Sequence, residues 1–286
     1  MKRLVNSIYY LVALLINVLL TLTNLRTQIL KSSCSRVKKV DTPIVVAMNG
    51  PTLKQDLNTL DCSGLCFLTA NHFADTELFI DIKPRFYVFS DPYFWRNDVS
   101  TDLHKSRIHT FENISKKTNW KMTIYVPNFE AKKFVSKYVK GNENVSVSNF
   151  NGYGYPIDYN IITHFFWRNN YFAPAGQNVL IHSLYIATML AKKKVYIVGA
   201  NFSFHQQISV DQKITSFINY VSMYMEKARS SHILTLLRRK KPGYQMSLKQ
   251  YLQLFSILDN LSLYSNKLGI KILNKTHDSY LDMFDR

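Results

Sequence analysis

The chain has 286 residues and a net charge of +17, from 36 Lys and Arg against 19 Asp and Glu. Its hydrophobic content of 47% excludes an intrinsically disordered chain, because that much apolar surface can offset the entropy lost on folding. Three cysteines are too few for a disulfide framework and indicate reduced thiols in a reducing compartment. The positive charge fits either nucleic acid or an anionic membrane surface as partner.

An apolar run opens the chain, since Leu4 to Leu25 contains no charged side chain. Roughly 22 residues of helix reach about 33 Å, enough to cross a hydrocarbon core of about 30 Å. No small-residue cleavage site follows the run, which disfavours a signal peptide. The polar residues Asn6, Asn17 and Asn24 interrupt the run, so a helix lying in the membrane interface is the alternative to a spanning one. Basic residues are more numerous after the run than before it, so we expect the large domain on the cytoplasmic side.

Residues 1–40 are thus expected to form a membrane anchor with a basic juxtamembrane segment, followed by one domain over residues 41–286. In that domain, short apolar runs rich in β-branched residues alternate with longer amphipathic stretches. The runs predict buried strands at Ile44–Met48, Leu65–Ala70, Phe86–Ser90, Met122–Val126, Val145–Val147, Val195–Val198 and Ile270–Leu273. The stretches predict helices at Asp98–Lys117, Phe129–Lys140, Val179–Lys193, Asp211–Leu237 and Ser247–Leu268. This alternation indicates a Rossmann-like α/β fold, a mainly parallel sheet with helices on both faces.

Short polar residues follow five of the expected strands. Such residues also form turns, but ligands of this kind of sheet bind beyond the carboxyl ends of its strands. Five polar segments at one edge therefore favour a polar pocket. The segments are Asn49–Thr52, Asn71–Phe73, Asp91–Tyr93, Gly199–Phe202 and Asn274–Thr276, with Ser279 close behind.

Two segments could bind a phosphate at a helix N-terminus. Gly50 and Thr52 could offer backbone N–H groups and a hydroxyl, and Gly176, Gln177 and Asn178 precede a strongly apolar helical stretch. Neither segment is a dinucleotide fingerprint or a Walker loop.

In this order, the segments resemble the bacterial sialyltransferases of glycosyltransferase family 42 and related proteins that share their nucleotide-binding core. The likeness runs from Thr42 to Phe284 and rests on "IVVAMNGPTL", "LTANHFAD", "VFSDPYFW", "AGQNVLIHSLYIATMLAKKKVYIVGANFSF" and "GIKILNKTHDSYLDMF". It implies a GT-A-like variant of the fold. It also implies a metal-independent transferase at the inner (cytoplasmic) membrane, which moves an acidic sugar from a CMP-linked donor onto a glycan or lipid-linked glycan acceptor of lipopolysaccharide or capsule.

By matching position, the resemblance implies that Asn49 and Asn71 contact the donor nucleotide and that Gln177 and Asn178 lie near its phosphate. The expected nucleotide-binding set is completed by Gly50, Thr52, Gly176, Asn201 and Ser279.

Glycosyl transfer needs a base for the acceptor hydroxyl and stabilisation of the departing phosphate. Histidine suits a base at neutral pH, and the candidates are His205, just beyond an expected strand end, and His232, with Asp91 as a third. Arg168 and Tyr171 are candidates for stabilising the phosphate, unless their aromatic stretch is a packed lid. The chain has no D-x-D motif and no zinc-type spacing around its cysteines, so we expect neither a metal site nor a cofactor.

Two other functions stay open. A magnesium-dependent, pterin pyrophosphokinase-like phosphotransferase could use the same core. A non-catalytic membrane-bound scaffold is suggested by Asn201 and Ser203, which stand where the family has Asp and Tyr. The basic runs Arg36–Lys39 and Arg238–Lys241 fit an anionic membrane surface, and the absence of a nucleic-acid motif disfavours nucleic acid as partner.

Overall fold

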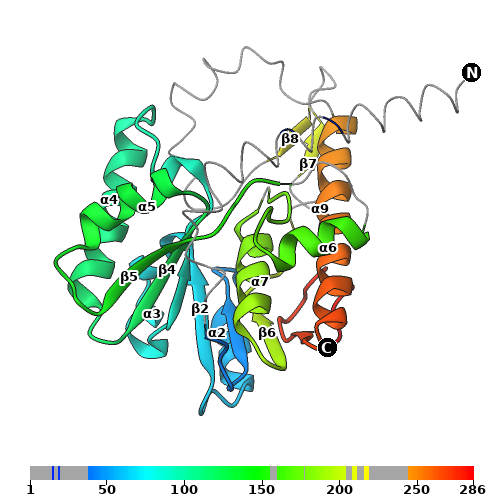
Figure 1. Ribbon diagram of the computed structural model, residues 1–286, viewed down its shortest axis with the longest axis horizontal. Helices are drawn as coiled ribbons and strands as arrows, with labels where there is room; N and C mark the ends of the chain where they lie inside the picture. Colours follow the sequence, from blue (N-terminus) through cyan, green and yellow to red (C-terminus); the bar gives the residue numbers. More distant parts are fainter. Residues whose placement is uncertain are drawn as a thin grey trace, which may run out of the picture.

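Seven parallel strands form the central sheet of the computed structural model, in the order β5-β4-β3-β2-β1-β6-β9 (Figure 1). The structure describes residues 38–154, 160–176, 178–203, 208–210, 216–218 and 244–286, together with Leu15 and Leu19. The strands are β1 (Ile44–Ala47), β2 (Cys66–Ala70), β3 (Phe86–Val88), β4 (Met122–Val126), β5 (Val145–Asn149), β6 (Lys194–Val198) and β9 (Lys271–Asn274). The expected parallel sheet is therefore confirmed.

Helices cover both faces of this sheet, as the alternating pattern predicted. Their bounds are α2 (Leu53–Thr59), α3 (Leu78–Ile82), α4 (Thr101–Lys117), α5 (Phe129–Val139), α6 (Asn160–Arg168), α7 (Val179–Leu190) and α9 (Tyr244–Lys267), with short 3-10 turns η3 (Asn71–Asp75) and η4 (Pro92–Phe94). Side-chain caps begin three of these α-helices: Ser100 accepts from Leu103 N–H, Asn128 from Ala131 N–H, and Asn178 from Leu180 N–H.

The two faces of the sheet carry separate cores. Leu180, Leu184 and Leu258 belong to the core beneath α7 and α9, whereas Leu53, Phe111 and Val135 belong to the core beneath α2, α4 and α5. Helix α7 lies against β1, β2, β3 and β6 and also contacts α9. It is therefore buried on nearly every side, which fits its almost entirely apolar sequence.

The connections place a topological switch point between β1 and β6. From β1 the chain adds β2, β3, β4 and β5 on one side, and it then returns to add β6 and β9 on the other. The loops that leave β1 and β6 consequently run to opposite faces of the sheet. Ligands of open α/β sheets bind where two such loops diverge, beyond the carboxyl ends of the strands.

One helix prediction is wrong in part. The stretch Asp211–Leu237 was expected to be helical, but Ser216–Ile218 forms strand β8, antiparallel to β7 (Ile208–Val210). Pairing of Ile208 with Ile218 in this hairpin outweighs the local helical pattern. The other residues of that stretch lie outside the described residues.

The apolar run Leu4–Leu25 also lies outside the described residues, apart from Leu15 and Leu19. Within the described parts of the chain, no helix combines the length and the hydropathy needed to cross a membrane.

Candidate functional site

The loops after β1 and β6 meet backbone to backbone at the switch point. Gly50 N–H donates to the Gly199 carbonyl at 2.8 Å, and Met48 N–H donates to the Val198 carbonyl at 2.9 Å. A Cβ on Gly50 would lie 2.3 Å from the Gly199 oxygen, and one on Gly199, whose φ is +66°, would lie 2.2 Å from the Met48 oxygen. Only glycine permits this approach, so both glycines have a structural role here.

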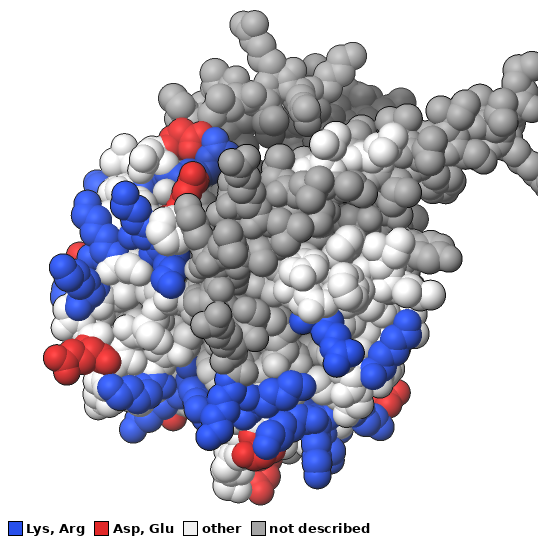
Figure 2. All heavy atoms as spheres, viewed as in Figure 1, with Lys and Arg blue, Asp and Glu red and all other residues white. Residues whose placement is uncertain are grey.

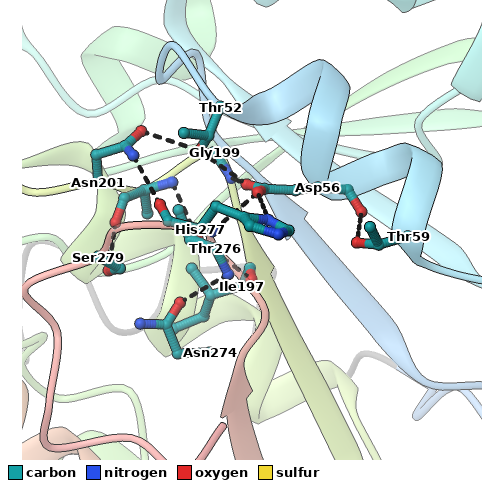
Figure 3. Close-up of polar contacts among 11 residues, drawn as sticks. Thr52, Asp56, Thr59, Ile197, Gly199, Asn201, Asn274, Thr276, His277 and Ser279 are labelled. Carbon is teal, nitrogen blue, oxygen red and sulfur yellow. Dashed lines mark hydrogen bonds and ion pairs between the residues drawn. The ribbon is translucent and has the colours of Figure 1, made fainter.

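Asp56 on α2 is the centre of a polar network at this point (Figure 3). Its side chain is fully buried. Oδ2 accepts from Gly199 N–H at 2.7 Å and lies 3.1 Å from Thr52 Oγ1, and Oδ1 accepts from His277 N–H at 2.9 Å. A buried carboxylate is tolerated only with such donors, so Asp56 joins the ends of β1, β6 and β9.

His277, in the loop after β9, forms an imidazole–carboxylate pair with Asp56. Nδ1 lies 2.9 Å from Asp56 Oδ1, while the histidine side chain is 40% exposed and the aspartate side chain 0% exposed. The carboxylate therefore favours the tautomer protonated at Nδ1. Nε2 is then the nitrogen that could accept a proton from a substrate, the arrangement found in histidine bases oriented by a carboxylate.

Asn201 and Ser279 lie at the same edge, but their polar groups hold the loops together. Asn201 Nδ2 donates to the His277 carbonyl at 2.8 Å, and its Oδ1 lies 3.2 Å from Thr52 Oγ1. Ser279 Oγ donates to the Ala200 carbonyl at 2.8 Å. Both side chains help to fix the His277 loop beside Asp56.

Asn49 and Asn71 follow neighbouring strands at this edge. Asn49 is exposed. Asn71 has a φ of 51°, in the left-handed region, and its side-chain oxygen is buried without a hydrogen-bond partner among the described residues. Strain together with an unsatisfied polar atom is typical of binding positions.

The second phosphate-binding segment precedes α7. Asn178 Oδ1 accepts from Leu180 N–H at 2.8 Å and so caps the helix. Gly176 packs on the ring of buried His182, since a Cβ there would lie 2.6 Å from two ring atoms. Burial lowers the pKa of His182 to about 4, opposed in part by the Pro174 carbonyl, so this imidazole is neutral at pH 7. Gln177 lies outside the described residues.

A buried histidine lies beyond β2 and β3. His72 Nδ1 lies 3.0 Å from Asp75 Oδ2 and 2.7 Å from Thr110 Oγ1, and its Nε2 contacts the Tyr93 hydroxyl. Burial alone would raise the pKa of Asp75, but the hydrogen bonds from His72, Asn113 and Thr110 together lower it. This network fixes η3 and η4 against α4.

Asp91 caps η4 by accepting from Tyr93 N–H at 3.1 Å. The residue is solvent-accessible, yet desolvation by the surrounding protein raises the pKa of its carboxyl, opposed by that hydrogen bond and by the nearby His72. Arg107 stabilises the same turn, because its buried guanidinium donates to the Tyr93 and Arg96 carbonyls, each at 2.6 Å.

Arg168 and Tyr171 do not join the switch-point residues. The carbonyl of the preceding Trp167 accepts from the Tyr185 hydroxyl at 2.8 Å, which places the end of α6 beside the middle of α7 rather than at its N-terminus. Tyr171 packs in an aromatic cluster with Phe165 and Phe166. This segment is therefore a packed aromatic stretch and does not face the switch point.

His205 and His232, the expected bases, lie outside the described residues. Across the described residues, no group of three or more His, Cys, Asp or Glu side chains could hold a metal ion. Cys62 is a free exposed thiol and Cys66 a free buried one.

The sequence predicted no role for Asp56 or His277, and His72 entered only as a member of the polar segment Asn71–Phe73. A signal for Asp56 was present, because it falls on the apolar stripe that Leu53 and Leu57 of α2 form with the C-cap residue Leu60, where a carboxylate needs a buried partner. His277 directly follows Thr276, the last residue of a polar segment that was recognised.

Comparison of the sequence with protein-family models and with curated proteins returned no match.

Proposed function

We propose that this protein is a membrane-associated, metal-independent glycosyltransferase, which moves an acidic sugar from a CMP-linked donor onto a surface-glycan acceptor. The observation that carries the proposal is the Asp56–His277 pair at the switch point between β1 and β6. A positioned base at that point supplies the proton acceptor that transfer to a sugar hydroxyl requires, at the same sheet edge as Asn49 and the strained Asn71.

His277 is the base in this proposal, in place of the expected His205, His232 or Asp91. Nε2 takes the proton of the acceptor hydroxyl while the acceptor oxygen bonds to the donor's anomeric carbon. The bond from that carbon to the phosphate oxygen breaks, and CMP leaves with the bonding electrons. Asp56 stabilises the imidazolium that forms, which later releases its proton to solvent.

The phosphate is assigned to backbone and polar groups at the carboxyl edge. Helix α7 presents its N-terminus there, with Gly176 and Asn178 leading into it, and helix N-termini favour anions.

A nucleotide panel tests the proposal. Thermal shifts of the detergent-solubilised full chain would be compared for CMP, CDP, UDP, GDP and ATP, each with EDTA and with Mg²⁺. We expect stabilisation by CMP that EDTA leaves intact. Binding of ATP alone, dependent on Mg²⁺, would overturn the proposal in favour of the phosphotransferase, and no shift with any nucleotide would favour the scaffold.

Turnover of a CMP-activated sialic acid then tests the base. His277→Gln should lower kcat by about a hundredfold or more while CMP still stabilises the protein, because a base acts on the chemical step rather than on donor binding. His109→Gln is the matched control and should leave kcat unchanged, because this exposed histidine lies on α4, which packs mainly against η3, η4 and α5.

A further inference from the structure

Lysines gather at the amino ends of three adjacent strands, on the edge opposite the candidate site. Figure 2 shows Lys and Arg concentrated along the lower edge of the molecule, where the strands begin in Figure 1. The lysines before or at the start of β1, β6 and β9 are all exposed, and we name them the basic edge: Lys38, Lys39, Lys192, Lys193, Lys194 and Lys271.

The fold brings these lysines together from three parts of the chain. Val40 N–H donates to the Leu190 carbonyl at 2.8 Å, which places the residues before β1 beside those before β6. Lys194 and Lys271 are direct partners in the β6–β9 register. Two positive charges therefore begin neighbouring strands, and an ion pair with Asp285 offsets only that of Lys271, so an anionic partner would reduce the repulsion that remains.

Carboxylates neutralise only part of the basic edge. Lys192 pairs with Asp41 at 2.5 Å, and Lys271 pairs with Asp285 at 3.0 Å. The remaining four lysines form no ion pair with any residue that the structure describes.

We propose that the basic edge is the surface by which the domain lies on an anionic lipid bilayer. The partner is indicated by where the chain enters the domain. Lys38 and Lys39 belong to the basic edge, and only 12 residues, 26–37, separate Lys38 from the apolar run that ends at Leu25. Fully extended, that segment spans at most about 45 Å, and it adds Arg26, Lys31 and Arg36 to the same charge. Anionic headgroups attract positively charged segments that lie next to an apolar membrane-binding run.

This orientation turns the candidate site away from the bilayer. Five residues of β6, Lys194–Val198, span about 17 Å between the basic edge and the loops around Asp56. On the proposed function, the acceptor hydroxyl must then stand at least that far from the lipid surface, which fits a glycan chain better than a sugar in the headgroup plane.

Cys62 offers a reporter for the contact, because it is exposed in the loop that leads into β2, beside the start of β1. Burial raises the pKa of Cys66 to about 11, so that thiol reacts slowly, and Cys34→Ser removes the third. The full chain would be placed in lipid nanodiscs of phosphatidylcholine, with or without phosphatidylglycerol, and alkylated with an uncharged polyethylene-glycol maleimide. A second reporter, Cys34→Ser/Cys62→Ser/Asn97→Cys, carries its thiol on the opposite edge.

We expect phosphatidylglycerol to slow alkylation of Cys62 by about fivefold or more and to leave Asn97→Cys unaffected, with about 0.5 M KCl abolishing the protection. The triple variant Lys39→Gln/Lys193→Gln/Lys194→Gln should lose the protection. The matched control Lys105→Gln/Lys117→Gln/Lys133→Gln removes three exposed charges from α4 and α5 and should keep it.

Equal alkylation rates in the two lipids, or protection of Asn97→Cys instead of Cys62, would overturn the proposal. Protection of Cys62 by RNA but not by phosphatidylglycerol would assign the basic edge to nucleic acid and equally reject a bilayer. Because CMP binding is measured separately, failure here leaves the proposed chemistry of the site standing.

Discussion

Replacing Asp56 by Asn tests the network at the switch point most directly. The change keeps the shape of the side chain but converts one acceptor oxygen into an N–H donor. The amide can be oriented in two ways, and in each its new N–H donor faces a backbone N–H that now donates to Asp56. In one orientation this is the Gly199 N–H and in the other the His277 N–H. Thr52 and the imidazole can adapt, the first by rotating its hydroxyl and the second by changing tautomer, but a backbone N–H cannot.

The expected loss of stability follows from these contacts. One hydrogen bond to a charged acceptor, about 1.5–3 kcal/mol, is lost and a buried N–H is left unpaired, at about 1–3 kcal/mol more. Asp56→Asn should therefore lower the free energy of unfolding by about 3 kcal/mol or more, as measured by guanidinium titration with tryptophan fluorescence. The exposed Asp81→Asn on α3 is the control and should stay within about 0.5 kcal/mol of the parent. A loss below about 1 kcal/mol for Asp56→Asn would refute the reasoning.

Three further predictions rest on the close contacts of single residues. Gly50→Ala should destabilise the fold in the same titration and weaken CMP binding, because its Cβ would lie 2.3 Å from the Gly199 oxygen, whereas Gly141→Ala, with no atom within 4 Å, should not weaken CMP binding. Between pH 6.5 and pH 4 the unfolded state protonates His182 and the folded state does not, so the free energy of unfolding should fall by up to about 1.4 kcal/mol per pH unit as the pH is lowered. His182→Leu should remove that slope, and an unchanged slope would show that His182 is not its source. Tyr93→Phe should lower the free energy of unfolding by about 1–2 kcal/mol, because it removes the hydroxyl that contacts His72 Nε2. An unchanged free energy of unfolding would show that this contact contributes nothing to stability.

Strand positions could be predicted closely from the sequence because apolar β-branched runs bounded by turn formers reflect burial on both faces of a parallel sheet. Met122–Val126 was predicted to the residue, and most other strand ends fell within one or two residues. Short elements such as α2 and α6 were not predicted, since a helix of two turns carries little periodicity. Ser216–Ile218 was misread because pairing with a neighbouring strand outweighed a local helical pattern.

The sequence by itself determined that polar segments end several strands of one parallel sheet, and hence that they share an edge. It could not determine which of them touch, because that depends on strand order: β1 lies between β2 and β6, and β6 beside β9. Asp56 and His277 are 221 positions apart, and only the packing of α2 against the end of β6 brings the buried carboxylate to the imidazole. The same holds for the basic edge, whose lysines are ordinary solvent-exposed charges in the sequence and become one surface only through the register of three strands. Local patterns record burial and backbone preference, whereas proximity between distant side chains is a property of the tertiary fold alone.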